Sequence, residues 1–219
     1  NIASSYYNLK QYEKAIEYFE RKRKINPEDI KTLDLISNSY INLKQYNKAI
    51  EYLEKQLQIN PDDNSILYQL AYYTIEDKQY SEGFNYLEKV LHIDPDNEQY
   101  LSLKGRSHFE LKQYEDAISC FNQIVEKNTR NNVAYIILSD SYKALEDYDK
   151  AIFYTYKSIE IEPENVIYYI RLSELCFKSN QTSLLLEVIH KVKANWINYQ
   201  SKLKEDFIKA DLSTKDLSL

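Results

Sequence analysis

The chain has 219 residues, and 43% of them are hydrophobic, so it carries enough apolar material for a folded core and is not a disordered tail. Its formal net charge of -6, from 34 acidic and 28 basic side chains, argues against a nucleic-acid-binding surface, which would be basic. No apolar run approaches the roughly 20 residues of a membrane span, and no N-terminal signal peptide is visible.

Turn-forming residues are scarce. Only two glycines and four prolines occur in the chain, which favours helices joined by short turns over a β-rich fold. Two cysteines, Cys120 and Cys176, do not make a disulfide framework, so we expect a reducing compartment and a cytoplasmic location. The chain starts at Asn1 and contains no methionine, which we interpret as the mark of a fragment.

All four prolines lie on one lattice with a spacing of 34 residues. They are Pro27, Pro61, Pro95 and Pro163, and Thr129 holds the lattice position between the last two. A fixed period of this length indicates a repeat architecture, in which each copy is one structural unit that packs against its neighbours.

The lattice divides the chain into segments. In chain order we expect a truncated first unit at 1–27, full units at 28–61, 62–95, 96–129 and 130–163, a divergent unit at 164–197, and a capping helix with a polar tail at 198–219. The divergent unit carries Thr182 and Leu185 at two columns that are otherwise tyrosine and small. The expected capping helix carries Phe207 and Ile208.

Apolar residues recur at helical spacing on two stripes per unit, which predicts two amphipathic helices. The first helix is expected to start after the proline, capped by Asp, Glu or Asn. The second is expected to start near a tyrosine and to stop before the next proline. The tyrosine column comprises Tyr12, Tyr46, Tyr80, Tyr114 and Tyr148.

Two further columns hold small residues, and both glycines of the chain fall in them. One comprises Ala15, Ala49, Gly83, Ala117 and Ala151; the other comprises Ala3, Ser37, Ala71, Gly105, Ser139 and Ser173. Small side chains allow two antiparallel helices to approach closely, so these columns predict the helix crossings.

The 34-residue period, the two helices, the small columns, the tyrosine at the turn and the proline at the end resemble the tetratricopeptide repeat over nearly the whole chain. The resemblance implies an all-α fold, a right-handed superhelical solenoid of antiparallel helix pairs. The pentatricopeptide repeat, which reads RNA, is the neighbouring family, and the acidic charge balance disfavours it.

In such solenoids the first helices line a concave groove, and the resemblance places the partner-binding positions there. The candidate residues are Asn38, Tyr68, Tyr72, Ile75, Arg106, Phe109, Ile136, Asp140 and Ile170. Tyrosine and arginine are frequent interface anchors, so we favour a peptide or helix ligand that binds around Tyr72 and Arg106.

One branch of the family binds acidic tails through a carboxylate clamp. Asn38 and Arg106 fall on clamp columns, but Asp34, Ser102 and Gln69 stand where the remaining donors would be. An aspartate would repel the carboxylate, so we disfavour a clamp. Further along, Val133, Ile136, Ile167 and Ile170 form an apolar wall, which either binds a ligand or is covered by residues 198–219 or a neighbouring copy.

No sequence pattern indicates catalysis, a metal or a cofactor. His92, His108 and His190 are far apart in the repeat scheme, and no metal-binding or phosphate-binding motif occurs. Our leading hypothesis is a non-enzymatic scaffold that binds a protein or peptide, without nucleic acid or a membrane span. The alternatives are a docking or regulatory module cut from a larger enzyme or assembly, and a structural module that forms a homo-oligomer through its terminal repeats.

Overall fold

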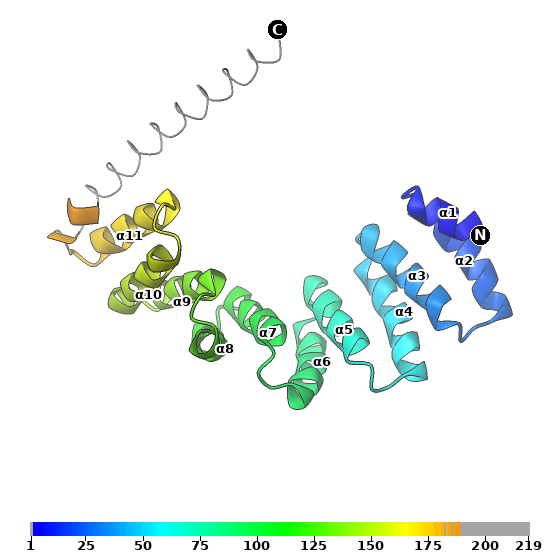
Figure 1. Ribbon diagram of the computed structural model, residues 1–219. Coiled ribbons are helices and arrows are strands. Elements are labelled where there is room, and N and C mark those ends of the chain that lie inside the picture. The colour runs from blue at the N-terminus through cyan, green and yellow to red at the C-terminus, as the bar shows by residue number, and fades with distance from the viewer. Residues whose placement is uncertain (1, 182, 185, 189–219) are drawn as a thin grey trace, which may run out of the picture. The chain divides into compact units, whose positions relative to one another are not determined.

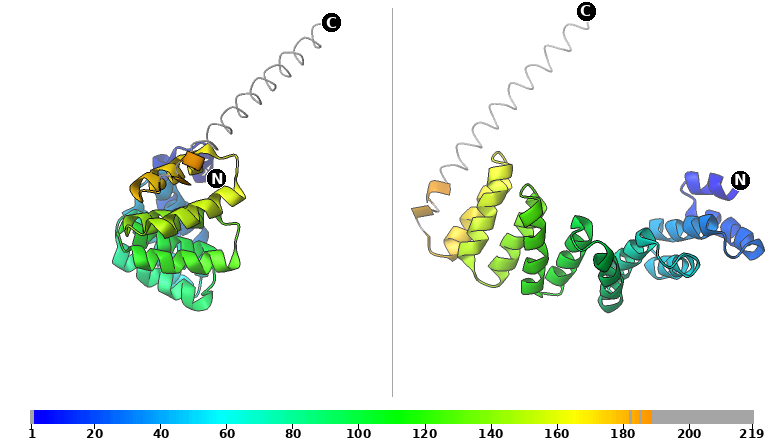
Figure 2. Two further views of the ribbon diagram at one scale, coloured as in Figure 1. Left: turned by 90° about the vertical axis from the view of Figure 1, so that its left-hand side faces the viewer. Right: turned by 60° about the horizontal axis from the view of Figure 1, so that its bottom comes forward.

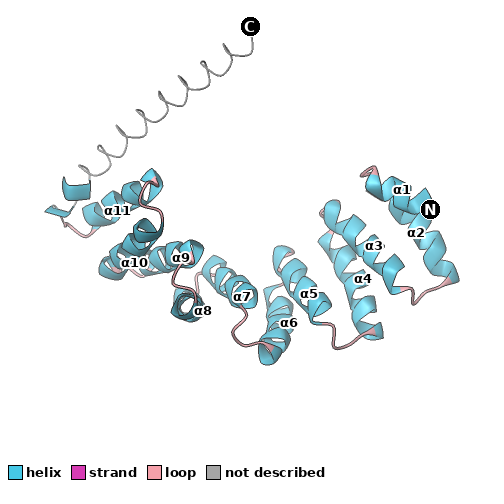
Figure 3. Ribbon diagram, viewed as in Figure 1, coloured by secondary structure: helices cyan, strands magenta, loops and turns pink. Residues whose placement is uncertain are grey.

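The structure, a computed structural model, describes residues 2–181, 183–184 and 186–188. Every element in these ranges is a helix, and they contain no strand (Figure 3). The predicted all-α fold class is therefore confirmed. The capping helix and tail expected at 198–219, the candidate positions Thr182 and Leu185, and the end of the divergent unit lie outside the described residues.

The chain divides into two compact units, residues 1–107 and 108–219, and each is described by itself. The helices follow one another in antiparallel pairs, which Figure 1 colours along the chain and Figure 2 shows from two further directions. In the first unit the helices are α1 (Ile2–Asn8), α2 (Tyr12–Ile25), α3 (Ile30–Asn42), α4 (Tyr46–Ile59), α5 (Asn64–Glu76) and α6 (Tyr80–Ile93). The boundary falls within α7 (Glu98–Glu110), and the second unit continues with α8 (Tyr114–Lys127), α9 (Asn132–Ala144), α10 (Tyr148–Ile161) and α11 (Val166–Lys178).

Each second helix from α2 to α10 begins at the tyrosine of the predicted column. Two positions before each of these tyrosines lies a residue with a left-handed backbone. A sixth such residue lies 34 positions after the fifth, just beyond the end of α11. These residues are Lys10, Lys44, Lys78, Lys112, Glu146 and Asn180, with φ between 55° and 67°. The backbone N–H of the residue after each of them donates a hydrogen bond back to the preceding helix. Gln45 N, for example, donates to Tyr40 O at 2.9 Å. Left-handed residues at helix ends are usually glycine, and here none is.

Polar side chains cap several of the first helices, as the sequence predicted, although Asp29 at the start of α3 makes no such bond. The carboxylate of Asp63 accepts hydrogen bonds from the backbone N–H groups of Ser65 at 3.0 Å and Ile66 at 3.1 Å. The side chain of Asn131 accepts one from the N–H of Ala134 at 2.9 Å. These bonds satisfy backbone donors that have no partner within the helix, and so fix where α5 and α9 begin.

The small columns lie at the helix crossings. Ala49, Ala117 and Ala151 are completely buried. At Gly83 an added Cβ would lie 2.5 Å from Cγ1 of Ile75 and 3.2 Å from the backbone oxygen of Ala71. The missing methyl group therefore leaves room for Ile75 to pack into the crossing between α5 and α6.

Ile75 is a correction to the predicted groove residues. It is only 5% exposed and belongs to the apolar cluster with Leu67, Leu87 and Val90. Its side chain is part of the core and does not contribute to a binding surface. The physical reason is Gly83, which opens the space that Ile75 fills.

Candidate functional site

The first unit contains a hollow between α5 and α7 that brings together three of the predicted site residues. Its volume is about 390 Å³. The lining residues are Tyr68, Tyr72, Glu98, Gln99, Ser102, Leu103 and Arg106. We call this feature the Tyr72–Arg106 hollow. Tyr68 and Tyr72 are one helical turn apart on α5, as are Ser102 and Arg106 on α7, so each helix presents two side chains to it.

Contacts between aromatic rings support the aromatic wall of the hollow. The ring of Tyr68 lies 5.1 Å from that of Tyr100, measured between centroids. The ring of Tyr72 meets Tyr73 edge-on at 5.1 Å, and Tyr73 stacks on Tyr46 at 5.6 Å. Tyr72 is nevertheless 36% exposed. It therefore offers an aromatic surface to a ligand from a position that its neighbours hold in place.

The hollow is lined by one basic side chain, Arg106, and one acidic side chain, Glu98. Burial raises the pKa of the Tyr68 hydroxyl, Tyr72 and Tyr100 raise it further, and the positive charge of Arg106 acts in the opposite direction. Tyr68 thus remains a neutral hydrogen-bonding group at neutral pH. No acidic side chain in the described ranges forms an ion pair with Arg106. Its exposed guanidinium is available to a ligand, and an arginine can bind a carboxylate through two parallel hydrogen bonds.

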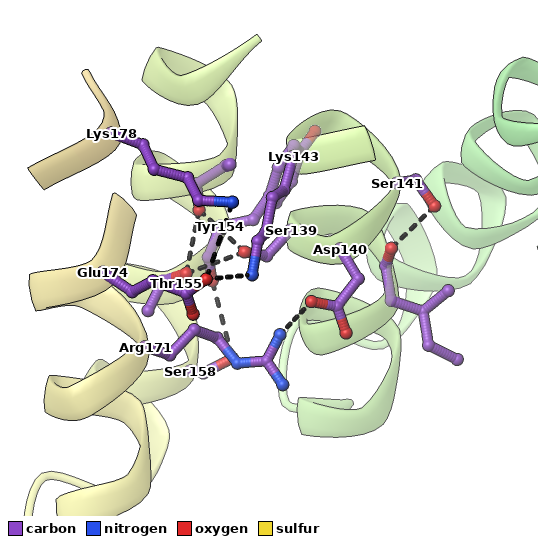
Figure 4. Close-up of polar contacts among 12 residues, drawn as sticks. Ser139, Asp140, Ser141, Lys143, Tyr154, Thr155, Ser158, Arg171, Glu174 and Lys178 are labelled. Atoms are coloured by element: carbon purple, nitrogen blue, oxygen red, sulfur yellow. Dashed lines mark hydrogen bonds and ion pairs between the residues drawn. The ribbon is translucent and has the colours of Figure 1, made fainter. Parts of the chain in front are cut away.

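The equivalent face of the second unit is built differently. Asp140 on α9 is paired with Arg171 on α11. Lys143 on α9 donates to Glu174 on α11 at 2.8 Å, and Lys178 lies 3.7 Å from the same carboxylate (Figure 4). The Lys143 hydrogen bond lowers the pKa of Glu174, so this carboxylate stays ionised. The charges of this face satisfy one another.

The remaining predicted residues do not gather into one site. The amide of Asn38 donates to Asp34 at 3.0 Å, so on α3 the clamp-column asparagine is already engaged by the aspartate expected to oppose a clamp. Phe109 belongs to the second unit and packs edge-on against Tyr114 at 5.5 Å. Ile136 is partly buried against the core between α9, α10 and α11. Ile170 is 58% exposed on α11.

Sequence reasoning missed Arg171, which decides the chemistry around Asp140. A signal was present. The inter-repeat ion pairs join residues 31 positions apart, which is one period less one helical turn. A similar pattern joins the second helices 32 positions apart, as where Tyr86 Oη donates to Glu54 at 3.1 Å. Complementary charged or polar side chains at these spacings lie next to one another on consecutive 34-residue repeats.

His108 and the two cysteines are held in the packing of the helices. His108 Nδ1, near the end of α7, lies 2.8 Å from Oε1 of Gln113, which precedes α8. Cys120 and Cys176 are both buried. In the described ranges, no group of three His, Cys, Asp or Glu side chains is arranged to hold a metal ion. No helix there is both long enough and apolar enough to cross a membrane.

Comparison with known families gives two matches. Residues 2–56 and 45–124 match the family model described as anaphase-promoting complex, cyclosome, subunit 3. Residues 133–165 match the model described as tetratricopeptide repeat. Comparison with curated proteins gave no match.

Solved structures with the same fold include several of the protein MamA. A MamA RS-1 double mutant is 22% identical, covers 78% of this chain and 97% of its own, and has a TM-score of 0.68. MamA from Desulfovibrio magneticus RS-1 is 22% identical over 77% of this chain and 96% of its own, with a TM-score of 0.67. A tetratricopeptide repeat protein from Parabacteroides merdae is 19% identical over 88% of this chain and 77% of its own, with a TM-score of 0.68. At these identities the likeness shows the fold alone.

Proposed function

This chain belongs to the tetratricopeptide repeat family, and we propose that it is a non-enzymatic scaffold that binds a segment of another protein in the Tyr72–Arg106 hollow. A helical repeat of this type is suited to protein–protein interaction. The family model that covers residues 2–124 is named for a subunit of a larger complex, which agrees with such a role.

The observation that carries the proposal is the pairing of an exposed aromatic ring with an arginine that has no ion-pair partner in the described ranges. Tyrosine and arginine bury a large area while keeping polar groups, and both are enriched among residues that dominate binding energy. A hollow of about 390 Å³ has room for one or two side chains and not for a folded domain.

The chemistry of the lining defines the ligand. An apolar or aromatic side chain would pack against Tyr72, and a carboxylate beside it would receive hydrogen bonds from Arg106. The hydroxyls of Tyr68 and Ser102 and the amide of Gln99 supply further polar contacts around the same space. We therefore propose a peptide or helix in which an acidic residue neighbours a large apolar one.

Selection from a displayed peptide library tests this proposal with the wild-type chain as bait. The selected peptides are expected to place Asp or Glu beside a large apolar residue. Their affinity, measured by fluorescence anisotropy, should fall at least tenfold for Tyr72→Ala and for Arg106→Glu, because a hot-spot residue contributes about 2 kcal/mol or more.

The matched control changes an equivalent pair on a second helix. Phe153 is 53% exposed on α10, and Lys157 Nζ lies 5.7 Å from its ring centre. The double variant Phe153→Ala, Lys157→Glu should bind the peptides as the wild type does. A peptide with lysine in place of its acidic residue should regain affinity for Arg106→Glu. Equal binding by wild type, Tyr72→Ala and Arg106→Glu would exclude the hollow as the binding site.

A further inference from the structure

The first unit contains a second cavity, which lies between the second helices α4 and α6 and shares no residue with the Tyr72–Arg106 hollow. Its volume is about 490 Å³. The lining residues are Glu54, Leu57, Gln58, Pro61, Leu67, Tyr86 and Lys89. We call this feature the Glu54–Tyr86 cleft. An adjoining cavity of about 680 Å³ shares Pro61, Leu67 and Lys89 with it and extends along α6 to Ile93.

The preceding pair of second helices shows which side chain occupies this place one repeat earlier. In the cleft, the hydroxyl of Tyr86 on α6 donates to Glu54 on α4 at 3.1 Å. One period earlier, Tyr52 on α4 donates in the same way to Glu20 on α2. There the guanidinium of Arg23 binds the other oxygen of Glu20 at 2.8 and 2.9 Å, and it lies 6.0 Å from the centre of the Tyr52 ring. Burial raises the pKa of Glu20, but the hydrogen bonds from Arg23 and Tyr52 outweigh it, so the pKa lies below its usual value.

In the Glu54–Tyr86 cleft this arginine is absent. Leu57 holds its position, one period after Arg23, and an aliphatic side chain cannot pair with a carboxylate. Glu54 accepts the hydrogen bond of Tyr86 and forms no ion pair within the described ranges. Burial raises the pKa of Tyr86 to about 12, and Glu54 adds to the effect, so the hydroxyl remains a neutral donor. A carboxylate, a tyrosine ring and open space thus surround the place that a guanidinium occupies one repeat earlier.

A lysine lies over the tyrosine ring in both arrangements. Lys89 Nζ lies 5.4 Å from the centre of the Tyr86 ring. One repeat earlier, Lys55 Nζ lies 4.2 Å from the centre of the Tyr52 ring, which Arg23 also contacts. The lysine of the cleft therefore does not prevent a guanidinium from binding at the same tyrosine. The carboxylates of the cleft and the adjoining cavity are Glu54, Asp62 and Glu88, and the basic side chains are Lys89 and His92. This excess of acidic groups favours a cationic ligand.

The second unit contains an uncharged form of the same arrangement. Tyr154 on α10 donates to the side-chain oxygen of Asn122 on α8 at 3.1 Å, and Val125 holds the arginine position. Asn122 carries no charge, so this tyrosine and amide need no cation beside them. Of these three described arrangements, only the Glu54–Tyr86 cleft combines a carboxylate with an aliphatic residue at the arginine position. Its negative charge is therefore left for a group from outside the chain.

We propose that the Glu54–Tyr86 cleft binds an arginine side chain of a partner protein, with a large apolar residue beside the arginine. The guanidinium donates to Glu54 and lies against the ring of Tyr86, as Arg23 does with its own partners one repeat earlier. The neighbouring apolar residue packs on the apolar part of the lining, which comprises Leu57, Pro61 and Leu67. This site does not depend on the ligand proposed for the Tyr72–Arg106 hollow.

Differential selection from a displayed library of random peptides tests this inference. Peptides are kept if they bind the wild-type chain, and discarded if they also bind Leu57→Arg, in which an arginine of the chain itself fills the cleft as Arg23 does on α2. The kept peptides should carry an arginine beside a large apolar residue. Their affinity, measured by fluorescence anisotropy, should fall at least tenfold for Glu54→Gln, because hydrogen bonds between charged groups are the stronger ones. Replacing the arginine of the peptide by citrulline, which is uncharged, should cost as much.

Glu20→Gln is the matched control, because Glu20 lies on the same column but is already bound by Arg23. It should bind the peptides as the wild type does, and so should Tyr72→Ala, which separates this site from the hollow. Far-UV circular dichroism of each variant confirms that the repeats remain folded. Unchanged affinity for Glu54→Gln, or an absence of arginine among the kept peptides, would overturn the proposal. Kept peptides rich in Asp and Glu that bind Lys89→Gln weakly would also overturn it and would assign the cleft to an anion.

Discussion

The first helices of the two units carry different side chains at the same position of the repeat. Positions 72 and 106 in the first unit, and 140 and 174 in the second, lie on one column of the 34-residue lattice. In the first unit the column holds Tyr72 and Arg106, which face a hollow. In the second it holds Asp140 and Glu174, which are neutralised by neighbouring cations.

The comparison indicates that the repeat determines the backbone fold, whereas a few side chains determine the chemistry of the surface. Charges that satisfy one another hold consecutive helices together, as on α9 and α11. A charge without an internal partner adds little to folding and is free to bind something else. We therefore expect ligand binding where the charged residue of this column has no ion-pair partner. Where it has such a partner, we expect it to contribute to the stability of the fold.

The largest expected effect concerns the crossing beneath the hollow. Gly83→Ala forces a methyl group against Ile75, and overpacking of this kind costs about 1–3 kcal/mol. Alanine regains about 1 kcal/mol of helix propensity, so we expect a net loss of up to about 2 kcal/mol in the free energy of unfolding. Urea denaturation followed by circular dichroism measures it.

The second unit supplies the control for this substitution. There, Ala151 and Lys143 occupy the positions of Gly83 and Ile75, and Ala151 is completely buried without a clash to relieve. Ala151→Gly should therefore destabilise the chain, by about 1 kcal/mol. In the first unit, Ile75→Val should recover part of the loss caused by Gly83→Ala. A stabilising Gly83→Ala would contradict our account of why Ile75 is buried.

The next effect compares two arginines. Arg171→Ala leaves Asp140 partly buried without its partner, and we expect a loss of about 1 kcal/mol in the free energy of unfolding. Arg106→Ala removes no ion pair and should change it by less than about 0.5 kcal/mol. Urea denaturation of both variants tests the contrast.

Asp140→Ala in the Arg171→Ala background completes a double-mutant cycle. The cycle should show a favourable coupling energy between the two residues. If Arg106→Ala destabilised the chain as much as Arg171→Ala, the cation of the hollow would have a structural role, and its availability to a ligand would be in doubt.

Most of the fold could be predicted because it depends on periodic features. The proline lattice predicted the 34-residue spacing of the helix pairs, and the tyrosine column predicted the starts of the second helices. The left-handed residues before those helices were not predicted, because Lys and Glu stand there and neither signals such a backbone. Tertiary context fixes that conformation at each turn.

The candidate site was predictable only in part. Tyr68, Tyr72 and Arg106 share a hollow because they lie on the inner columns of adjacent first helices. The burial of Ile75 depends on the absence of a methyl group at Gly83, eight residues away on another helix. The pairing of Asp140 depends on Arg171, which lies on a column that holds no charge in the other described first helices. Column periodicity alone reveals neither interaction.

The smallest expected effect concerns the ion pair between α9 and α11. The hydrogen bond from Lys143 lowers the pKa of Glu174 below its usual value of 4.5. A lowered carboxyl pKa contributes stability that is present above the unfolded value and is lost as the pH falls through the folded value. Glu174→Gln should therefore destabilise the chain slightly at neutral pH, by a few tenths of a kcal/mol, because the pair is half exposed.

This difference should disappear once the pH has fallen through the lowered pKa of Glu174, because the glutamate of the wild type is then protonated as well. Urea midpoints of wild type and Glu174→Gln, measured from neutral to acid pH, would show two curves that converge. Curves that stay parallel would mean that the carboxylate charge contributes nothing to the packing of α11 on α9. The polar contrast between the two first-helix faces would then rest on Asp140 and Arg171 alone.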